Sequence, residues 1–424
     1  MYDRCDSHYN PLYAYRTVPR VHRTFIAASA LLVAFGSTAV AQNGQPADKK
    51  VEELKDDVEL LTDEVMTLQS EVEELRAGMG ALTLGSNKFL VTGYGTVGFT
   101  DTEHGNSSFS TSLSPLFLWK ASDKLLFSAE LQFGLEDHGT ETELEYANAA
   151  YIVNDHLTLR FGKLLTPLST FQEHQHPTWI NKLPNSPMFA AHGGHGSGAQ
   201  LVPITSLGAE ARGGFTLDNG MKLTYSAIIS NGPVLDVDHD PGTLEFNNFA
   251  DINNNKAIGG RIGFLPIPEL EIAYGFQYAG DVVADGEGFD DVALVTHVLA
   301  VSYVTEKDAI GGRIEARAEF VLNDFDTELD FGSGPIDLDR QGGYLQVAYR
   351  PTLSEGFVKD LEGVVRYDFV DQPSEFAFDS DRYTAGVNYW VSPSAVFKLA
   401  YMWEDAEGSR EGEDALMLQF AIGF

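Results

Sequence analysis

A two-residue alternation of apolar side chains runs from Lys88 to the end of the chain and constrains the fold more than any other feature. The final segment DALMLQFAIGF places Leu, Phe and Ile on one parity, ending at Phe424, and Met, Gln, Ala and Gly on the other. A period of two is that of a β-strand with one apolar face. The segments KLLFSAELQFGLE, GGRIEARAEFVL and LEGVVRYDFV repeat the pattern, with polar or charged residues on the opposite parity. This region is therefore predicted to be all-β.

The apolar faces distinguish between two classes of β protein. A soluble sandwich also alternates and remains an alternative, but its strands are shorter and its polar face is the solvent surface. Here strand after strand has an apolar face with aromatic residues near its ends, as in a lipid-facing band around a polar interior. No apolar stretch reaches the roughly 18 residues that a membrane-spanning helix needs. A membrane span would then have to be a closed barrel, because lipid cannot satisfy an open sheet edge.

The spacing of the turn residues predicts a transmembrane antiparallel β-barrel of about sixteen strands over residues 88–424. Short connections alternate with longer, acidic, Gly- and Asn-rich ones, which is typical of periplasmic turns and external loops. An even number of strands places both ends of the barrel on the side of the short turns. The strand near 292–304 is apolar on both parities, so the alternation does not assign its faces. The short connections are 121–124, 153–156, 217–220, 265–269, 305–308 and 391–394.

The first 41 residues have the features of a secretory signal peptide, and a short buried helix is the alternative. The apolar core TFIAASALLVAFGS follows three arginines and precedes a small-x-small cleavage site, AVA, at 39–41. The only cysteine, Cys5, lies before the predicted cut. We therefore predict export of a mature chain without disulfides.

Residues 51–84 are predicted to form a periplasmic α-helical coiled coil, after a linker at 42–50. Valine at a and leucine at d repeat on a strict heptad, which is typical of coiled coils. A single helix on a domain is the alternative, although such helices usually show a wider apolar stripe. A coiled coil predicts an oligomer, and this core composition leans towards two strands. The predicted oligomerisation residues are Val51, Leu54, Val58, Leu61, Val65, Leu68, Val72 and Leu75.

The charge and the motifs of the chain argue against two functions. The chain has 62 Asp and Glu residues against 28 Lys and Arg residues, a formal net charge of −34. Nucleic-acid binding is not expected, because phosphate contacts need a basic patch. The sequence has no G-x-S-x-G, H-E-x-x-H or P-loop motif. We therefore predict that the protein is not an enzyme and has no cofactor.

One connection, between strands five and six, is far longer than a hairpin turn. It follows LTLRFGKL and is rich in Pro, Gly and aromatic residues. Such loops are usually functional, and a loop folded into the channel of a barrel would narrow it. We expect an inward loop, with an external cap as the alternative. Its four imidazoles are candidate metal ligands, but we favour pore lining and predict no metal site. The loop residues expected at the constriction are His174, His176, Trp179 and Lys182.

Strand parity places basic and acidic side chains together on the inner face of the barrel. Arg160, Arg212 and Arg261 come from strands close to the long loop and are the strongest candidates for the constriction. A lumen of mixed charge would orient water and small polar solutes, and it would not concentrate anions strongly. Further candidates for the pore are Lys163 at the base of the loop, Arg313, Arg317, Glu130 and Glu210.

The segment RFGKLLTPLSTF, the long loop after strand five, the count of about sixteen strands and the final Phe424 resemble the phosphate-selective porin O and P family. The resemblance covers residues 88–424 and implies a homotrimer of barrels, each with its own pore. In that family, phosphate specificity rests on lumen arginines and a lysine cluster. Because the lumen here is mixed, we predict an outer-membrane porin for passive diffusion of small hydrophilic solutes or ions. The alternatives are a phosphate- or anion-specific porin, and a structural tether acting through the coiled coil.

The last residue also predicts a partner. A terminal Phe424 on the closing strand resembles the assembly signal of Gram-negative outer-membrane barrels, so the outer-membrane assembly machinery is expected to bind it. The other expected partners are outer-membrane lipid, lipopolysaccharide and small solutes. The expected location is the cell outer membrane, with the coiled coil in the periplasm.

Overall fold

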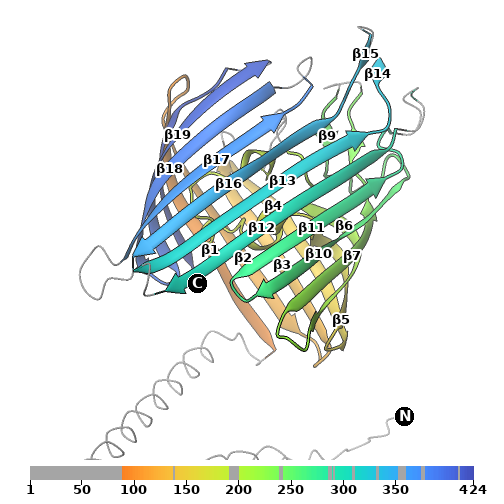
Figure 1. Cartoon of the computed structure of the whole chain (residues 1–424), viewed down its shortest axis with the longest axis horizontal. Helices are drawn as coiled ribbons and strands as arrows, with labels where there is room; N and C mark the ends of the chain where they lie inside the picture. The colour runs from red at the N-terminus through yellow and green to blue at the C-terminus, as the bar shows by residue number, and fades with distance from the viewer. Residues whose placement is uncertain are drawn as a thin grey trace, which may run out of the picture. The chain divides into compact units, whose positions relative to one another are not determined.

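The computed structural model contains a closed antiparallel β-barrel (Figure 1). The predicted signal peptide, linker and coiled coil lie outside the described residues, so these stay predictions. The structure describes residues 88–136, 139–190, 200–237, 242–284, 289, 292–307, 311–330, 334–351, 360–373, 378–408 and 411–424.

Sixteen strands pair in sequence order around the barrel, and the first strand closes the barrel against the last. This confirms the predicted fold class for the barrel and the predicted strand number. The barrel strands are β1 (Phe89–Thr102), β2 (Ser108–Lys120), β3 (Leu125–Glu136), β4 (Gly139–Asn154), β5 (Leu157–Leu165), β6 (Thr205–Thr216), β7 (Lys222–Asn231), β10 (Lys256–Ile267), β11 (Leu270–Ala279), β12 (Leu294–Lys307), β13 (Gly312–Phe325), β16 (Arg340–Pro351), β17 (Leu361–Asp371), β18 (Phe378–Ser392), β19 (Ala395–Gly408) and β20 (Ala415–Gly423).

The two ends of the barrel differ in their connections. Short turns join β2 to β3, β4 to β5, β6 to β7, β10 to β11 and β18 to β19, in agreement with the predicted turns. At the other end, two small hairpins lie outside the barrel sheet. They pair β8 (Val234–Leu235) with β9 (Leu244–Glu245) and β14 (Leu329–Asp330) with β15 (Pro335–Ile336). A buried apolar cluster joins these hairpins to the neighbouring strand ends, and it includes Leu235, Leu244, Val282, Phe325 and Leu338.

The last strand has the two faces that its alternation predicts. Leu418 and Ile422 are exposed on the outer face, and Ala421 is buried on the inner face. The Phe424 backbone N–H donates to the Gly93 carbonyl (2.9 Å), and the Gly93 N–H donates to the Phe424 carbonyl (3.0 Å). The chain end therefore completes the wall of the barrel.

Aromatic rings meet across neighbouring strands on the outer surface. The ring centroids of Tyr367 and Tyr383 are 5.0 Å apart, and those of Phe397 and Phe420 are 4.5 Å apart. An exposed apolar and aromatic outer surface is what lipid contact requires of a barrel. None of the helices in the described residues is both long enough and apolar enough to cross a membrane.

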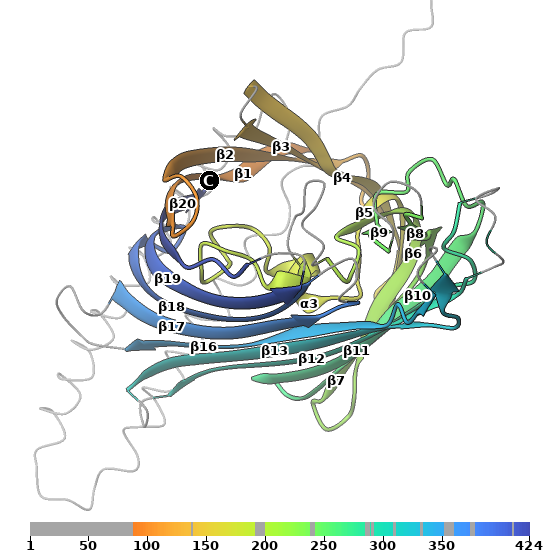
Figure 2. The ribbon, with the colours of Figure 1, turned by 90° about the horizontal axis from the view of Figure 1, so that it is seen from above.

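The long connection between β5 and β6, residues 166–204, is called the inward loop from here on. Its described parts, 166–190 and 200–204, lie inside the barrel (Figure 2). They contain α3 (Thr170–His174) and a 3-10 helix, η1 (Met188–Ala190). Leu168 and Phe189 of the loop pack in one buried cluster with Val298 and Tyr344 of the barrel wall. The predicted inward position is confirmed for these residues, and the external cap is excluded for them.

The same packing assigns the two apolar faces of β12. Leu299 and Val301 are exposed on the outer face, whereas Thr296, Val298 and Ala300 are buried on the inner face. Val298 is apolar because the inward loop, and not water, covers it. A barrel strand can therefore be apolar on both sides where protein fills the lumen next to it.

Candidate functional site

The first turn of α3 is attached to the inner wall by a single carboxylate of β13. Glu319 accepts hydrogen bonds from the Ser169 hydroxyl (2.8 Å), the Thr170 N–H (3.2 Å) and the Phe171 N–H (2.6 Å). Ser169 is also the N-cap of α3, since its hydroxyl accepts a hydrogen bond from the Gln172 N–H. Glu319 is buried, so its carboxylate is shielded from the water of the channel while it binds the loop.

Farther along the loop, backbone carbonyls face basic side chains of the wall. Lys398 of β19 donates to the carbonyls of Thr178 (2.5 Å) and Asn181 (2.7 Å). Arg366 of β17 donates to the carbonyl of Asn185 (3.1 Å). The wall thus supplies a carboxylate where the loop offers N–H groups, and cations where the loop offers C=O groups. These charge-assisted hydrogen bonds are stronger than neutral ones.

The loop also carries one buried cation of its own. The Lys182 Nζ lies 2.8 Å from Glu362 Oε1 and 3.6 Å from Glu315 Oε2. It lies 5.3 Å from the ring centroid of Trp390, a distance at which a cation–π contact adds to the ion pairs. Lys182 therefore fixes the loop to β13, β17 and β18.

A cluster of four predicted pore residues lies on the β5–β6 side of α3. Arg160 Nη1 lies 2.9 Å from Glu210 Oε2, and Arg212 Nε lies 2.8 Å from Glu210 Oε1. Arg212 also pairs with Glu173 of α3, and Arg160 Nη1 is 3.9 Å from the same carboxylate. His174 Nε2 lies 3.3 Å from Glu173 Oε2. The structure thus brings Arg160, Arg212, Glu210 and His174 together around Glu173, which the sequence alone does not single out.

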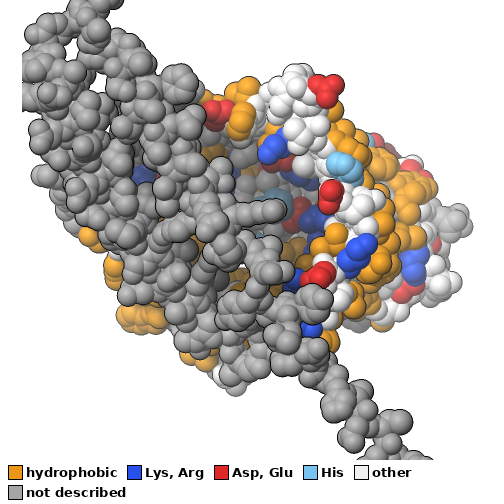
Figure 3. Space-filling model, turned by 90° about the horizontal axis from the view of Figure 1, so that it is seen from below, with side chains coloured by type: hydrophobic (Ala, Val, Ile, Leu, Met, Phe, Trp, Pro, Cys, Tyr) orange, Lys and Arg blue, Asp and Glu red, His pale blue; other side chains and the backbone are white. Residues whose placement is uncertain are grey.

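Within this cluster the cation faces the water and the carboxylates lie behind it. The Arg212 side chain is 30% exposed, whereas those of Glu173 and Glu210 are 6% and 0% exposed. On β13, Arg313 is 48% exposed and its partner Glu315 is 3% exposed. A view from below shows Lys and Arg side chains next to Asp and Glu side chains, bordered by apolar side chains (Figure 3). At both places a more exposed arginine covers a buried carboxylate, so the accessible surface there is basic.

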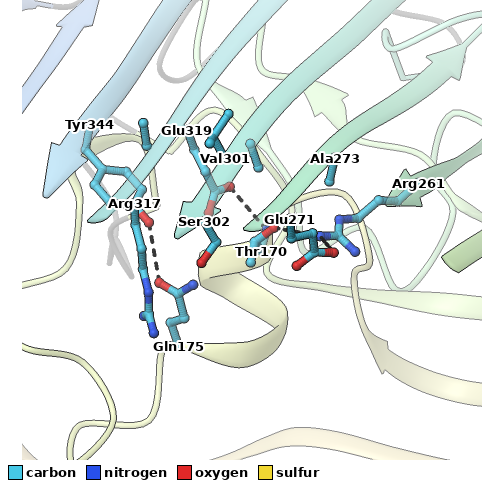
Figure 4. Close-up of a pocket in the computed structure, with 12 residues that line it drawn as sticks. Thr170, Gln175, Arg261, Glu271, Ala273, Val301, Ser302, Arg317, Glu319 and Tyr344 are labelled. Atoms are coloured by element: carbon cyan, nitrogen blue, oxygen red, sulfur yellow. Dashed lines mark hydrogen bonds and ion pairs between the residues drawn. The ribbon is translucent and has the colours of Figure 1, made fainter. Parts of the chain in front are cut away.

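Arg261 of β10 reverses this arrangement, because its side chain is 8% exposed and that of its partner Glu271 is 24% exposed. Arg261 points towards Thr170 of α3 (Figure 4). Its guanidinium donates to the Glu271 carboxylate (2.7 Å) and to the Thr170 hydroxyl (3.0 Å). The Arg317 guanidinium of β13, also close to α3, lies 2.5 Å from Glu315 Oε1. Arg261 therefore attaches the first turn of α3 to β10.

The inner faces of β1 and β2 carry hydroxyl groups and glycine in place of charges. Thr96 lies opposite Ser112, with their hydroxyl oxygens 2.8 Å apart, and both are partly exposed. Next to them, the Tyr94 hydroxyl donates to Glu130 Oε1 (2.6 Å), and both of these side chains are buried. Glu130 thus lies on the inner wall, as its parity predicts, but it pairs with a tyrosine of β1.

The remaining predicted residues lie apart from the cluster. Lys163 has the outward parity of Phe161, and its ammonium lies 3.4 Å from Glu143 and 4.7 Å from the ring centroid of Phe249. The structure therefore does not bring Lys163 to the lumen, because the pairing of β5 with β6 stays in register to Leu165 and the strand keeps its alternation. In the loop, His176 Nδ1 lies 2.6 Å from the Gln172 carbonyl, and the Trp179 indole lies against Gly423 of β20.

The imidazole of His174, next to the Glu173 carboxylate, is a second titratable group of α3 near the basic side chains. Desolvation inside the barrel lowers its pKa below the ordinary value, although the side chain is 54% exposed. The carboxylate of Glu173 opposes this shift, and the guanidinium groups of Arg261 and Arg212 reinforce it. In the part of the chain that the structure describes, no group of three His, Cys, Asp or Glu residues could hold a metal ion; the loop imidazoles at 192 and 195 lie outside that part.

Strand parity alone does not single out the wall residues that hold the loop, Glu319, Arg366 and Lys398. One signal in the sequence points to their region, since β12 is apolar on both parities and must be covered on its inner side. Which charge meets which backbone group depends on the path of the loop in three dimensions. No local pattern encodes that path.

Comparisons with known proteins agree with this architecture. The family model for phosphate-selective porin O and P matches residues 119–421. The chain is similar to a high-pH structure of Pseudomonas putida OprB (TM-score 0.55, 9% identity, 80% of this chain and 94% of that chain). It is similar to Salmonella typhi OmpF in a complex with daunomycin (TM-score 0.52, 10% identity, 80% and 98%). It is also similar to an anion-selective porin from Comamonas acidovorans (TM-score 0.51, 12% identity, 79% and 99%). At these identities the likeness shows the fold alone, and no curated protein matches the sequence.

Proposed function

Because the chain belongs to the phosphate-selective porin O and P family, we propose that its channel favours small anions weakly over cations. The family and the closed barrel make the protein an outer-membrane porin. Small hydrophilic solutes and ions diffuse through it passively, past the inward loop. The family is one of channels, and we propose no catalytic role.

The weak anion preference rests on the difference in burial within the ion pairs. Arg212 and Arg313 have the inward parity and are partly exposed, while the carboxylates that pair with them are almost fully buried. Exposed charges between low-dielectric walls focus the potential that a passing ion meets. The carboxylates behind the arginines reduce this potential, which is why we propose a weak preference.

The engagement of the other basic residues argues against strong phosphate binding. Arg366 and Lys398 are occupied by carbonyls of the loop, and Lys182 is occupied by Glu362. A phosphate site needs cations that are free to meet the anion. The basic residues of this lumen are mostly engaged in holding the loop.

The test is the reversal potential of the pure protein in a planar bilayer with a salt gradient. We expect a sign that indicates anion preference, and a smaller value for Arg212→Gln. Lys163→Gln removes the same charge from the outward parity, so it is the matched control and should behave like the wild type. A cation-selective wild type would contradict the proposal. Block by low concentrations of phosphate would support the phosphate-specific alternative.

We also propose that the porin is a homotrimer whose coiled coil lies in the periplasm. The heptad at 51–75 supports an oligomer. The family resemblance supports three subunits, in place of the two that the heptad core alone favours. Phe424 is the proposed signal for the outer-membrane assembly machinery, and lipid and lipopolysaccharide are the proposed surroundings of the outer face. Conductance steps in groups of three would support the trimer.

The heptad leaves one second candidate, a structural tether between the outer membrane and the cell wall. A helix of about 27 residues would reach roughly 40 Å at about 1.5 Å per residue. Deletion of 51–75 separates the two functions. A porin should still conduct after the deletion, whereas a tether should lose its envelope phenotype.

A further inference from the structure

Glu319 is a lumen-side carboxylate whose hydrogen bonds, among the described residues, go to one turn of the inward loop. A carboxylate has about four acceptor positions, and three donors from Ser169, Thr170 and Phe171 occupy this one. Figure 4 shows Glu319 pointing from β13 towards Thr170. The side chain is buried, so a solute in the channel does not touch it.

The turn that Glu319 holds depends on contacts with the wall for its stability. α3 has five residues, which is far below the length at which a helix is stable in isolation. The Ser169 hydroxyl caps it and donates to Glu319 at the same time. The orientation of this turn therefore depends on the wall beneath it.

The wall below α3 fits the turn closely. A Cβ added to Gly275 of β11 would come within 2.7 Å of the Leu168 carbonyl oxygen, so only glycine permits this approach. Tyr344 of β16 donates to Gln175, just after the helix, at 3.4 Å. The pocket between α3 and the strands leaves no room for a water molecule. The turn therefore lies directly against the wall at Glu319 and Gly275.

The other end of this turn reaches the exposed arginine of the pore. Glu173, two residues after Phe171, pairs with Arg212, and His174 follows it in α3. An unbroken series of contacts thus runs from Glu319 through α3 to Arg212. Each link is an ion pair, a hydrogen bond or a backbone segment of at most two residues.

We propose that Glu319 is a positioning residue that sets the ion preference of the channel through α3, without contact with the ion. The inference rests on the proposed porin function. The two lumen charges then have different roles. Glu319 fixes the geometry of the constriction, and Arg212 provides the charge that the ion meets. Loss of the Glu319 charge would release α3 and let Arg212 move away from its place at the opening.

The test compares Glu319→Gln with the wild type in single-channel recordings. We expect a higher conductance, more current noise and a reversal potential shifted towards zero. Glu319→Asp keeps the charge and should retain more of the wild-type ion preference than the amide does. Glu404→Gln removes an inner-wall carboxylate that accepts from Ser380 of the neighbouring strand, and it is the matched control. It should leave the conductance and the current noise unchanged and should not shift the reversal potential towards zero.

A second readout does not depend on conduction. Residues 88–424 contain no cysteine, so His174→Cys gives a single reporter in the barrel. We expect a charged methanethiosulfonate reagent to modify it faster when Glu319→Gln is added. This readout tests the positioning even if the wild type fails to conduct, an outcome that would contradict the porin proposal alone.

Two outcomes would overturn the inference. One is a folded Glu319→Gln barrel with the conductance, reversal potential and modification rate of the wild type. The other is a variant that yields less folded barrel but keeps the ion preference, since that would show a structural role only. If Glu319→Gln does not form a heat-modifiable barrel, Ser169→Ala removes one of the three donors and should give a smaller change in the same direction; no change would count against the proposal.

Discussion

The inner wall of this barrel has two parts, and they differ in the kind of residue that they carry. On β12, β13, β16 and β17, the inward residues Val298, Val321, Tyr344 and Val370 are buried in one cluster with the inward loop. On β1 and β2 the inward residues are mainly Thr, Ser and Gly, and Thr96 is partly exposed. One part is therefore suited to protein and the other to water. The loop lies against the apolar part of the wall. Its position there determines which side of the lumen the loop fills.

The largest effect should come from placing a charge on each part of the wall. Val298→Asp would bury a carboxylate without a partner, which costs several kcal/mol or forces the loop away. We expect displacement of the loop and a large rise in single-channel conductance. Thr96→Asp puts the same charge on the hydroxyl-bearing wall. There we expect nearly wild-type conductance and a reversal potential that indicates a greater preference for cations. If both variants keep the wild-type conductance, apolar packing does not hold the loop.

A smaller effect should come from removing one of the cations that bind the loop carbonyls. Arg366 and its partner Asp368 are both 0% exposed, and removal of one member of such a pair costs about 3–5 kcal/mol. Arg366→Gln should therefore lower the free energy of unfolding and increase current noise, because the bond to the Asn185 carbonyl is lost as well.

The control for Arg366→Gln is Arg313→Gln, because the Arg313 side chain is 48% exposed. Its partner Glu315 also pairs with Arg317 and Lys182, so the loss of Arg313 leaves no carboxylate without a cation, and this variant should unfold at nearly the wild-type denaturant concentration. Urea unfolding of both variants in the same detergent or lipid gives the comparison. Equal losses of stability would contradict the division of the lumen cations into loop-binding and water-facing ones.

The division of the wall also explains how much of the structure could be predicted from the sequence. The period of two, the turn spacing and the faces of β20 follow from local patterns, so the strand number and the inward parity of Arg160, Arg212 and Glu319 could be predicted. The same parity places Lys163 on the outer face. The prediction that Lys163 lines the pore relied on its nearness to the loop in sequence, but the pairing of β5 stays in register to its end. The partners of the loop could not be predicted, because they come from strands that are far away in sequence. Only the two apolar faces of β12 indicate where the loop lies.

The smallest effect should come from the charge on the imidazole of α3. Desolvation inside the barrel lowers the pKa of His174 below its ordinary value, so the ring is neutral at neutral pH and gains a positive charge only as the pH falls through that lowered value. A new cation beside Arg212 should increase the preference for anions when the pH goes from roughly 8 to roughly 5. His174→Gln should lose this part of the pH dependence and keep the part that comes from carboxylates. The measurement is the reversal potential of both proteins across the same pH series. Identical curves would show that the ion path does not pass the Glu173 side of α3, and this would move the constriction towards the hydroxyl-bearing wall of β1 and β2.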